Sequence, residues 1–363
     1  MKSHQFLLYG ANGYTGRLIA RFAHLYGLSP ILAGRSGEVL KVMAKQLNLP
    51  FKIIELDDEQ ALIAALQEVK VVLHAAGPFE HTARKMADAC LKSGTHYLDI
   101  NGDISVFEML KAYHQQAVEA GIMIMPGVGF DVVPTDCVAL LLKNKMPEAV
   151  KLELAFASTG GGLSHGTATT MATKLGEGGV ARIDGKITKV RLGAKGMLVD
   201  FFRGTSQPAK KLFVMSIPWG DVSTAHTTTG IPNIETFTGI SKKLYYVLKA
   251  QGLFNWLLRT SLVRNIAIKK IKALPAGPTD EQRKNAKSLV WGRVTAADGR
   301  AKIAKLCGPD GYTLTMYSAL IIIQKVVAGN FQPGFQTPAK QYGPGIIEEV
   351  PGVEMMDDGE MGS

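Results

Sequence analysis

A glycine-rich segment near the start of the chain has the residue types of a phosphate-binding loop. Gly10, Gly13 and Gly16 are spaced three residues apart, after an apolar run and before a segment with helical periodicity. The first glycine permits a tight turn, the second lets the backbone approach a pyrophosphate, and the third lets the helix pack close to the strand. The loop predicts a dinucleotide site, with a bare tight turn as the alternative. The residues expected to bind the cofactor here are Gly10, Asn12, Gly13, Tyr14, Thr15 and Gly16.

The residues after the second apolar run indicate which dinucleotide would bind. A site that prefers NAD has an acidic residue there, whereas this chain has Arg35 and Ser36. A guanidinium group and a hydroxyl group suit a 2′-phosphate, so we expect NADP (NADPH); a solvated Arg35 at a helix start is the alternative. Asp57, after the third apolar run, is expected near the adenine, or else as the N-cap of the following helix.

The fourth apolar run ends in small residues and a proline. Ala76, Gly77 and Pro78 would let the nicotinamide half of a dinucleotide pass close to the backbone, because ligands of open α/β sheets bind beyond the carboxyl ends of the strands. A plain loop is the competing interpretation.

The elements that must position these loops alternate between short apolar runs and helix-period segments from residue 6 to about 125. Each apolar run has the length of a buried parallel strand, and each connection is long enough for a crossover helix. This predicts an α/β fold with a Rossmann-type doubly wound parallel sheet.

Taken in order, five motifs resemble the saccharopine dehydrogenase-like NAD(P)-binding oxidoreductases, a family that includes trans-acting enoyl reductases. They are GANGYTG (10–16), AGRS (33–36), HAAGPF (74–79), HYLDINGD (96–103) and GFDVVPTD (129–136), and residues 334–339 are similar to the closing motif of the family. The resemblance implies a Rossmann domain that binds NADP, an inserted second domain and a C-terminal return to the first.

The chain departs from the family where the resemblance places the wall between nicotinamide and substrate. The family commonly ends this motif in Ser-Gly-Glu, and here the residues are Asn101, Gly102 and Asp103. No arginine cluster beside the motifs is suited to an amino-dicarboxylate. We therefore expect an NADPH-dependent reductase of a hydrophobic or acyl unsaturated substrate, similar to an enoyl reductase. The alternatives are a saccharopine dehydrogenase-type reduction of an imine or amino-acid-derived substrate, and a non-catalytic NADP-binding scaffold or sensor at a membrane surface.

Nicotinamide chemistry needs one proton donor beside the substrate. Tyr97, His96 and Asp131 are the candidates, since each is expected near the carboxyl edge of the sheet; His165, in a glycine-rich segment, is a fourth. For each of them the alternative is a packed or hydrogen-bonded residue in the wall of the site, without a catalytic role.

No HExxH zinc motif, nucleotide-triphosphatase phosphate loop or Ser-His-Asp order occurs, so the sequence excludes those hydrolase classes and predicts no metal.

The second half of the chain changes character. Segments 187–203, 211–217 and 223–229 are β-rich and punctuated by turns, which predicts an antiparallel sheet in an inserted α+β domain for substrate binding and dimerisation. Residues 244–272 are expected to form one long helix. The predicted division is a dinucleotide domain at 1–148, an inserted domain at 149–315, a return segment at 316–345 and a flexible acidic tail at 346–363.

The net charge of +10 is unevenly distributed. Residues 241–305 contain 15 lysines and arginines against 3 acids, and the tail contains 6 acids and no base. This concentration suits a surface that binds an acidic carrier protein or an anionic membrane, with a solvated basic helix face as the alternative. No nucleic-acid module accompanies the charge, so we expect no nucleic-acid partner.

Cellular location and assembly are predicted from the cysteines, the first residues and the second sheet. The three cysteines have no disulfide or zinc spacing, and no signal peptide is recognisable, so we expect a cytoplasmic protein, with a location peripheral to a membrane as the alternative. A sheet in the second domain would offer a face for a homodimer.

Overall fold

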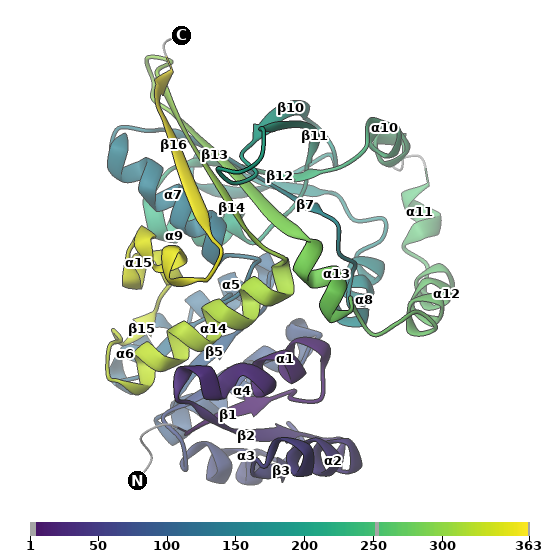
Figure 1. Ribbon diagram of the computed structural model, residues 1–363, viewed down its shortest axis with the longest axis vertical. Helices are drawn as coiled ribbons and strands as arrows, with labels where there is room; N and C mark the ends of the chain where they lie inside the picture. The colour runs from purple at the N-terminus through teal and green to yellow at the C-terminus, as the bar shows by residue number, and fades with distance from the viewer. Residues whose placement is uncertain (1–4, 251–253, 362–363) are drawn as a thin grey trace. The chain divides into compact units, whose positions relative to one another are not determined.

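The computed structural model describes residues 5–250 and 254–361, and these form two compact units. The first unit comprises residues 1–133 and 312–342, and the second comprises residues 134–311 and 343–363. Figure 1 traces the chain through both units.

The first unit is built on a seven-stranded parallel sheet in the order β15-β6-β5-β4-β1-β2-β3. This confirms the predicted Rossmann-type fold. Its strands are β1 (Gln5–Tyr9), β2 (Ser29–Gly34), β3 (Phe51–Ile53), β4 (Val71–His74), β5 (His96–Asp99), β6 (Met123–Met125) and β15 (Gly334–Phe335). Its helices are α1 (Tyr14–Phe22), α2 (Gly37–Leu47), α3 (Glu59–Leu66), α4 (Phe79–Ser93), α5 (Ile104–Lys111), α6 (His114–Glu119), α14 (Gly311–Val327) and α15 (Pro338–Tyr342).

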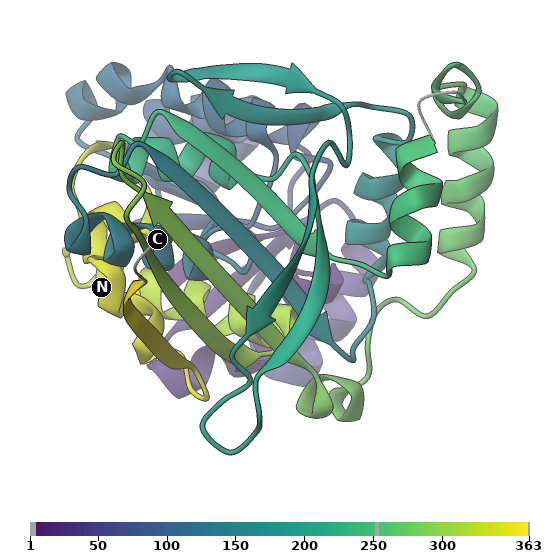
Figure 2. The same ribbon diagram turned by 90° about the horizontal axis from the view of Figure 1, so that it is seen from above.

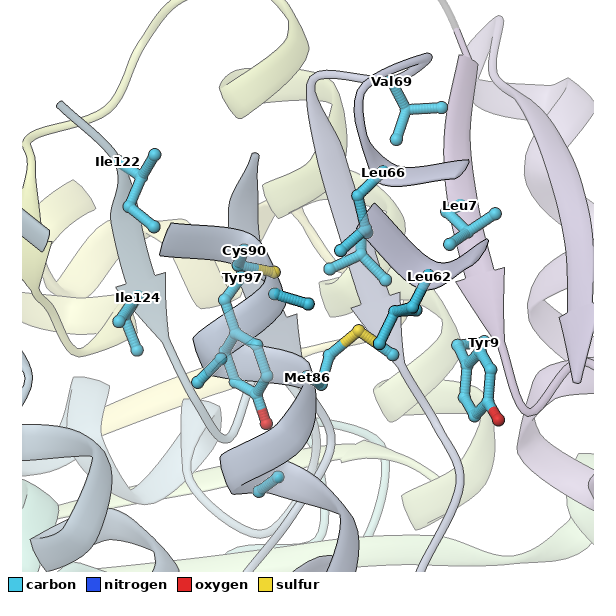
Figure 3. Close-up of a cluster of buried hydrophobic side chains, with 14 of the residues drawn as sticks. Leu7, Tyr9, Leu62, Leu66, Val69, Met86, Cys90, Tyr97, Ile122 and Ile124 are labelled. Carbon is cyan, nitrogen blue, oxygen red and sulfur yellow. The ribbon is translucent and has the colours of Figure 1, made fainter. Parts of the chain in front are cut away.

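One face of this sheet is covered by α3, α4 and α5, whose apolar side chains form a common core with those of the strands. Leu62 and Leu66 of α3 and Met86 of α4 pack against Leu7 and Tyr97 of the sheet, and all five are at most 1% exposed (Figure 3). The helices bury one side because their apolar residues recur at spacings of three and four. This core fixes the positions at which the strands end.

The second unit is built on a mixed, mostly antiparallel sheet in the order β10-β11-β12-β7-β13-β14-β16. Strand β8 pairs with β12, and β9 pairs with β8; β12 and β7 are parallel. Figure 2 gives the view turned by 90° from Figure 1, in which the long strands of this sheet are nearest to the reader. The strands are β7 (Lys151–Thr159), β8 (Gly179–Ile183), β9 (Lys186–Val190), β10 (Gly196–Phe201), β11 (Lys210–Ser216), β12 (Asn233–Gly239), β13 (Lys287–Thr295), β14 (Ala301–Pro309) and β16 (Glu354–Met361). The helices are α7 (Val133–Lys145), α8 (His165–Thr173), α9 (Asp221–Thr229), α10 (Lys242–Ala250), α11 (Asn255–Leu258), α12 (Ser261–Lys272) and α13 (Asp280–Asn285).

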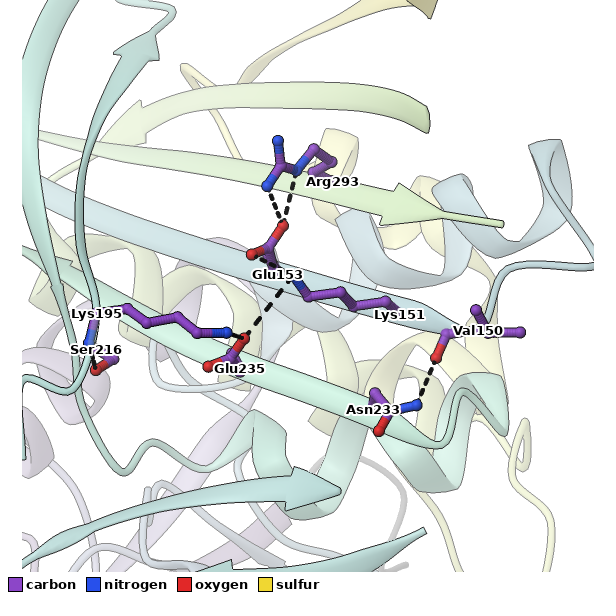
Figure 4. A network of polar contacts seen from close by, with 8 residues as sticks. All are labelled: Val150, Lys151, Glu153, Lys195, Ser216, Asn233, Glu235 and Arg293. Atoms are coloured by element: carbon purple, nitrogen blue, oxygen red, sulfur yellow. Dashed lines mark hydrogen bonds and ion pairs between the residues drawn. The ribbon is translucent and has the colours of Figure 1, made fainter. Parts of the chain in front are cut away.

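A polar network lies across three neighbouring strands of the second sheet (Figure 4). Glu153 of β7 is 3% exposed and accepts hydrogen bonds from Lys151 Nζ at 2.8 Å and from Arg293 Nε at 2.7 Å. The two cations stabilise the ionised carboxylate and hold its pKa below the usual value, although burial opposes them. The network is paired within the sheet, so we assign it a structural role.

The domain limits differ from those expected. The units divide after Val133, so α7 lies in the second unit rather than the first. The prediction of a flexible acidic tail at 346–363 is wrong for the described residues, because β16 pairs with β14 and Glu354 accepts hydrogen bonds from the Thr205 amide and hydroxyl at 2.8 and 2.9 Å. An ion pair between Lys145 and Asp357 adds to this attachment.

Two predicted elements of the second unit are also wrong. The segment 223–229 lies in helix α9, which packs against β8 and β12 and ends at Gly230 in the left-handed conformation; within it the Thr229 hydroxyl bonds back to the Ala225 carbonyl at 2.6 Å. The long helix expected at 244–272 is divided into α10, α11 and α12, because Thr260 caps a new helix by accepting a bond from the Val263 amide. Residues 251–253 lie outside the described part.

Candidate functional site

The loop between β1 and α1 has its glycines where other parts of the backbone come close. Gly10 has φ +86°, and a Cβ there would lie 2.7 Å from the Ala75 carbonyl carbon at the end of β4. A Cβ at Gly16 would lie 2.5 Å from the Gly10 carbonyl oxygen. Gly13 is the N-cap of α1, and no side chain caps the helix there. The first turn of α1 thus presents amide groups suited to an anion.

Asn12 links this loop to the end of the next strand. Its side-chain oxygen lies 3.4 Å from where a Cβ would stand on Gly34, the last residue of β2, and its carbonyl accepts a hydrogen bond from Arg17 Nε at 3.0 Å. Arg35 and Ser36 follow β2 directly. Arg35 is exposed, and Ser36 is the N-cap of α2 without a capping side-chain bond. A guanidinium group and a hydroxyl group are therefore both presented beside a second helix N-terminus.

Asp57 lies beyond β3 and is not the N-cap that the sequence left open as an alternative. Asp58 caps α3, accepting a bond from the Ala61 amide at 3.0 Å, while Asp57 forms an ion pair with Lys85. A shallow open hollow at this point is lined by Ile53, Ile54, Glu55, Asp57 and Asp58.

The segment after β4 is fixed by hydrogen bonds to the hydroxyl group of Thr82 in α4. The Thr82 hydroxyl lies 2.9 Å from the Ala76 carbonyl and 2.9 Å from His74 Nε2. His74 is fully buried, and desolvation lowers its pKa to about 3, so the ring is neutral. Gly77 and Pro78 remain exposed at the end of the sheet. The predicted cofactor residues of this loop are thus accessible on a fixed backbone.

The end of β5 is organised by Asp99, a buried carboxyl group that the sequence analysis did not single out. The Tyr97 hydroxyl donates to Asp99 Oδ2 at 2.6 Å, while the Asn101 and Gly127 amides donate to Oδ1 at 3.0 and 2.8 Å. Burial raises the pKa of Asp99, and these hydrogen bonds oppose the shift. An acidic residue ending an apolar strand was the signal that could have identified it.

Two of the candidate proton donors have no access to this edge. Tyr97 is fully buried, and its hydroxyl is occupied by Asp99. The expected position of His96 is wrong: it begins β5, its amide bonds the Lys70 carbonyl before β4, and it therefore lies at the amino edge of the sheet. His96 Nδ1 accepts a bond from the Met123 amide, and burial lowers its pKa to about 4.

His165, the fourth candidate, begins α8 in the second unit. The glycine-rich segment that contains it is helical from this residue to Thr173. Its Nε2 lies 2.6 Å from the Leu274 carbonyl, which gives His165 a structural contact within that unit.

Asp131 is the candidate that lies at the carboxyl edge and is partly exposed. Its carboxyl group packs on Gly102, where a Cβ would stand 2.6 Å from Oδ2. Burial raises the pKa of Asp131 to about 7. The loop that carries it is fixed by α14, since the Phe130 amide donates to Thr315 Oγ1 at 2.9 Å. A carboxyl group that exchanges its proton near neutral pH is thus held on a rigid loop.

The departure from the family motif has a structural explanation. Asn101 Oδ1 accepts a bond from the Asp103 amide at 2.5 Å, and Asp103 caps α5 by accepting one from the Ser105 amide at 2.9 Å. Both side chains serve the turn between β5 and α5.

Tyr312, at the start of α14, is a further residue that the sequence analysis missed. Its ring packs edge-on against the ring of Tyr14, and the two ring centroids are 4.9 Å apart.

These features define the first unit as a dinucleotide-binding domain: a parallel sheet of Rossmann order, a glycine loop leading into an uncapped helix, and strand ends that converge on one edge. Within the described residues no cluster of metal-ligating side chains is present, and no helix is long and apolar enough to span a membrane.

The comparison with family models identifies this domain. Residues 6–125 match the saccharopine dehydrogenase NADP binding domain. Among curated proteins, a saccharopine dehydrogenase-like oxidoreductase of Bos taurus is 29% identical over 160 residues, covering 39% of this chain and 37% of that protein. A trans-acting enoyl reductase of Mycobacterium tuberculosis is 33% identical over 138 residues, covering 36% of this chain and 33% of that protein. The chain thus matches about a third of the length of these relatives.

A solved structure extends the likeness of fold to both units. Apo saccharopine dehydrogenase (L-Glu forming) from Saccharomyces cerevisiae has a TM-score of 0.65 and covers 98% of this chain and 99% of its own, at 14% identity. At this identity the likeness concerns the fold alone.

Proposed function

We propose that the chain is an NADPH-dependent reductase that acts on a hydrophobic, acyl-type unsaturated substrate. The observation that carries the proposal is the convergence, at one sheet edge, of a dinucleotide loop and the protonatable Asp131. The enoyl reductases among the relatives support the choice of a conjugated double bond as the acceptor.

The residues of the first unit fit an NADP molecule. The amides at the start of α1 would bind the pyrophosphate, because no side chain occupies them as a cap. Arg35 and Ser36 would bind the 2′-phosphate. The exposed backbone at Gly77 and Pro78 would lie along the nicotinamide half.

When bound, the reduced nicotinamide supplies the hydride that reduces the β-carbon of the substrate. Asp131 then delivers its proton to the α-carbon and regains one from water, which completes the reduction of the double bond. The Tyr97–Asp99 pair keeps the adjacent loops in place by accepting the amides of Asn101 and Gly127.

The polarity of the nearby loops favours an acyl substrate over an amino-dicarboxylate. Residues 75–78, 100–103 and 126–132 follow β4, β5 and β6, and none of them is lysine or arginine. A substrate carboxylate would have no cationic partner there.

The test of the activity is NADPH oxidation against enoyl thioesters of graded chain length, with imines and ketones of amino-acid type as a second panel. We expect turnover with the thioesters and a loss of kcat on the order of a hundredfold in Asp131→Asn, with NADPH affinity changed less than about twofold. Turnover restricted to the imine panel would favour the saccharopine dehydrogenase type of reaction. Tight NADPH binding with no turnover of any acceptor would contradict the reductase and favour a scaffold.

The cofactor preference has its own test. Arg35→Asp is expected to weaken NADPH binding by about tenfold or more relative to NADH, because a carboxylate repels the 2′-phosphate and accepts a ribose hydroxyl. Isothermal titration with both dinucleotides measures this ratio, and the exposed Arg21→Asp on α1 is the matched control. Equal losses for both dinucleotides would contradict the role of Arg35.

A further inference from the structure

Helices α10, α11 and α12 of the second unit present apolar side chains to solvent. Trp256 is 73% exposed, Leu262 is 69% exposed and Ile266 is 50% exposed. No residue of α11 or α12 is buried, although both helices are rich in leucine and isoleucine. Large exposed apolar surfaces on a folded protein mark interaction sites. The other strongly exposed apolar residues here are Leu244, Tyr246, Val247, Phe254, Leu257 and Leu274.

These helices are held to the second unit by polar contacts with backbone carbonyls. Arg264 Nη2 donates to the Leu175 carbonyl at 2.7 Å, and Arg259 Nε donates to the Gly176 carbonyl at 2.9 Å. Helix α12 lies against α8, and Figure 1 shows α10, α11 and α12 following one another along the side of the unit. The face of α12 toward α8 is only partly buried, and the row of Leu262 and Ile266 remains exposed to solvent.

The same stretch is strongly cationic. Residues 241–274 contain eight lysines and arginines and no acidic residue. Arg259 and Arg264 serve the attachment, which leaves six lysines, and all six are exposed. On α12, Lys269 and Lys270 stand three and four residues after Ile266, so they continue the exposed row of Leu262 and Ile266 by one turn. The six lysines are Lys242, Lys243, Lys249, Lys269, Lys270 and Lys272.

We propose that α10–α12 form a docking surface for an anionic lipid bilayer. The apolar side chains would enter the boundary between headgroups and acyl chains, where tryptophan and tyrosine are favoured, and the lysines would meet the lipid phosphates. Neither α10 nor α12 is long enough to span a bilayer, so the helices would lie in the plane of the surface. A two-fold pairing of two copies through this surface would bring like charges together, which disfavours self-association as its purpose.

The test is flotation of the full chain with vesicles of phosphatidylcholine alone and of an equimolar mixture with phosphatidylglycerol. We expect binding to the anionic vesicles, weaker binding to neutral vesicles, and partial release by salt, since charge and apolar insertion act together. Brominated lipids should quench the fluorescence of the bound wild type, and Trp256→Phe should abolish most of that quenching. Neither measurement requires NADPH turnover, so their failure is distinguishable from failure of the proposed reductase.

Two double variants separate the apolar and the ionic contributions, each with a matched control on exposed strand residues. Leu262→Ser with Ile266→Ser is expected to lower the vesicle-bound fraction about tenfold, while Ile187→Ser with Leu198→Ser leaves it unchanged. Lys269→Gln with Lys270→Gln should lower binding to anionic vesicles several-fold, while Lys210→Gln with Lys211→Gln does not. Circular dichroism of each variant verifies the fold.

Three results would overturn the proposal. The first is equal flotation of the wild type and of both α12 variants. The second is dependence on the lysines alone, with no quenching by brominated lipid, which would favour an acidic protein partner. The third is a concentration-dependent dimer, seen by analytical ultracentrifugation, that Leu262→Ser with Ile266→Ser disrupts while vesicles have no effect.

Discussion

Helix α3 of the first unit and helix α12 of the second have the same apolar spacing and opposite surroundings. Leu62 and Leu66 are four residues apart on α3 and are almost completely buried (Figure 3). Leu262 and Ile266 have the same separation on α12 and are exposed. Periodicity therefore indicates that a helix has an apolar face, and the neighbours of the helix decide whether that face is covered.

The neighbours differ in a way that explains the outcome. Helix α3 packs against α4 and the parallel sheet, where apolar side chains from several elements meet. Helix α12 packs against α8, whose side chains include few large apolar groups, so its facing side chains are only partly buried, and Arg264 bonds the Leu175 carbonyl just after α8. A helix attached in this manner keeps its apolar face available for a partner.

Replacing one leucine by alanine in each helix should give the largest difference between the two regions, measured as the change in the free energy of unfolding. Leu66→Ala should lower the free energy of unfolding by about 3 kcal/mol, because it removes buried methyl groups and leaves a cavity. Leu262→Ala should change it by less than about 0.5 kcal/mol, because its side chain is already solvated. Urea denaturation of both variants measures the difference.

If both variants lost a similar free energy of unfolding, the contrast between α3 and α12 would be wrong, since this would show that Leu262 is covered in solution. Because the lipid proposal needs an accessible α12, the same result would weaken that proposal as well. Leu198→Ala, on an exposed strand position of the second unit, controls for the substitution itself.

The first unit was predictable from the sequence because its signals are local. Each apolar run and each helical period from residue 6 to 125 became a strand or a helix of the parallel sheet. The glycine positions were informative for the same reason: Gly10 and Gly16 are required by close backbone approach, which depends on the strand-loop-helix unit alone.

The remaining parts of the site depended on contacts between distant segments. Asp99 gathers the Asn101 and Gly127 amides, and Thr315 fixes the Asp131 loop from a position 185 residues away. His96 was misplaced because it is the first residue of β5, and the first residue of a strand in a parallel sheet lies at the amino edge, whereas Asp99 lies at the carboxyl edge. In the second unit, threonines that favour strands by propensity lie in α9, because the packing of this helix against β8 and β12 outweighs their local preference.

The two regions should also differ, by a smaller amount, in how the free energy of unfolding depends on pH, because a carboxyl group is partly buried in one and lysines are exposed in the other. Asp131 is partly buried, and its pKa in the folded protein is about 7, against 3.8 as the ordinary value. The folded state therefore holds the proton more tightly than the unfolded state, and stability should fall as the pH rises from about 4 through 7 and level off above that. Asp131→Asn removes this penalty, so its stability relative to the wild type should increase by about 1–2 kcal/mol between pH 5 and pH 8.

The charges of α12 provide the matched comparison, because Lys269 and Lys270 are exposed and folding does not remove them from water. Lys269→Gln with Lys270→Gln should therefore leave the relative stability unchanged from pH 5 to pH 8. Thermal unfolding at several pH values measures both variants, and buried His74, which destabilises the fold as the pH falls below 6.5, contributes equally to each and cancels in the differences. A pH-independent difference for Asp131→Asn would show that Asp131 is ionised in the folded protein throughout this range, and it would remove the acid from the proposed reduction.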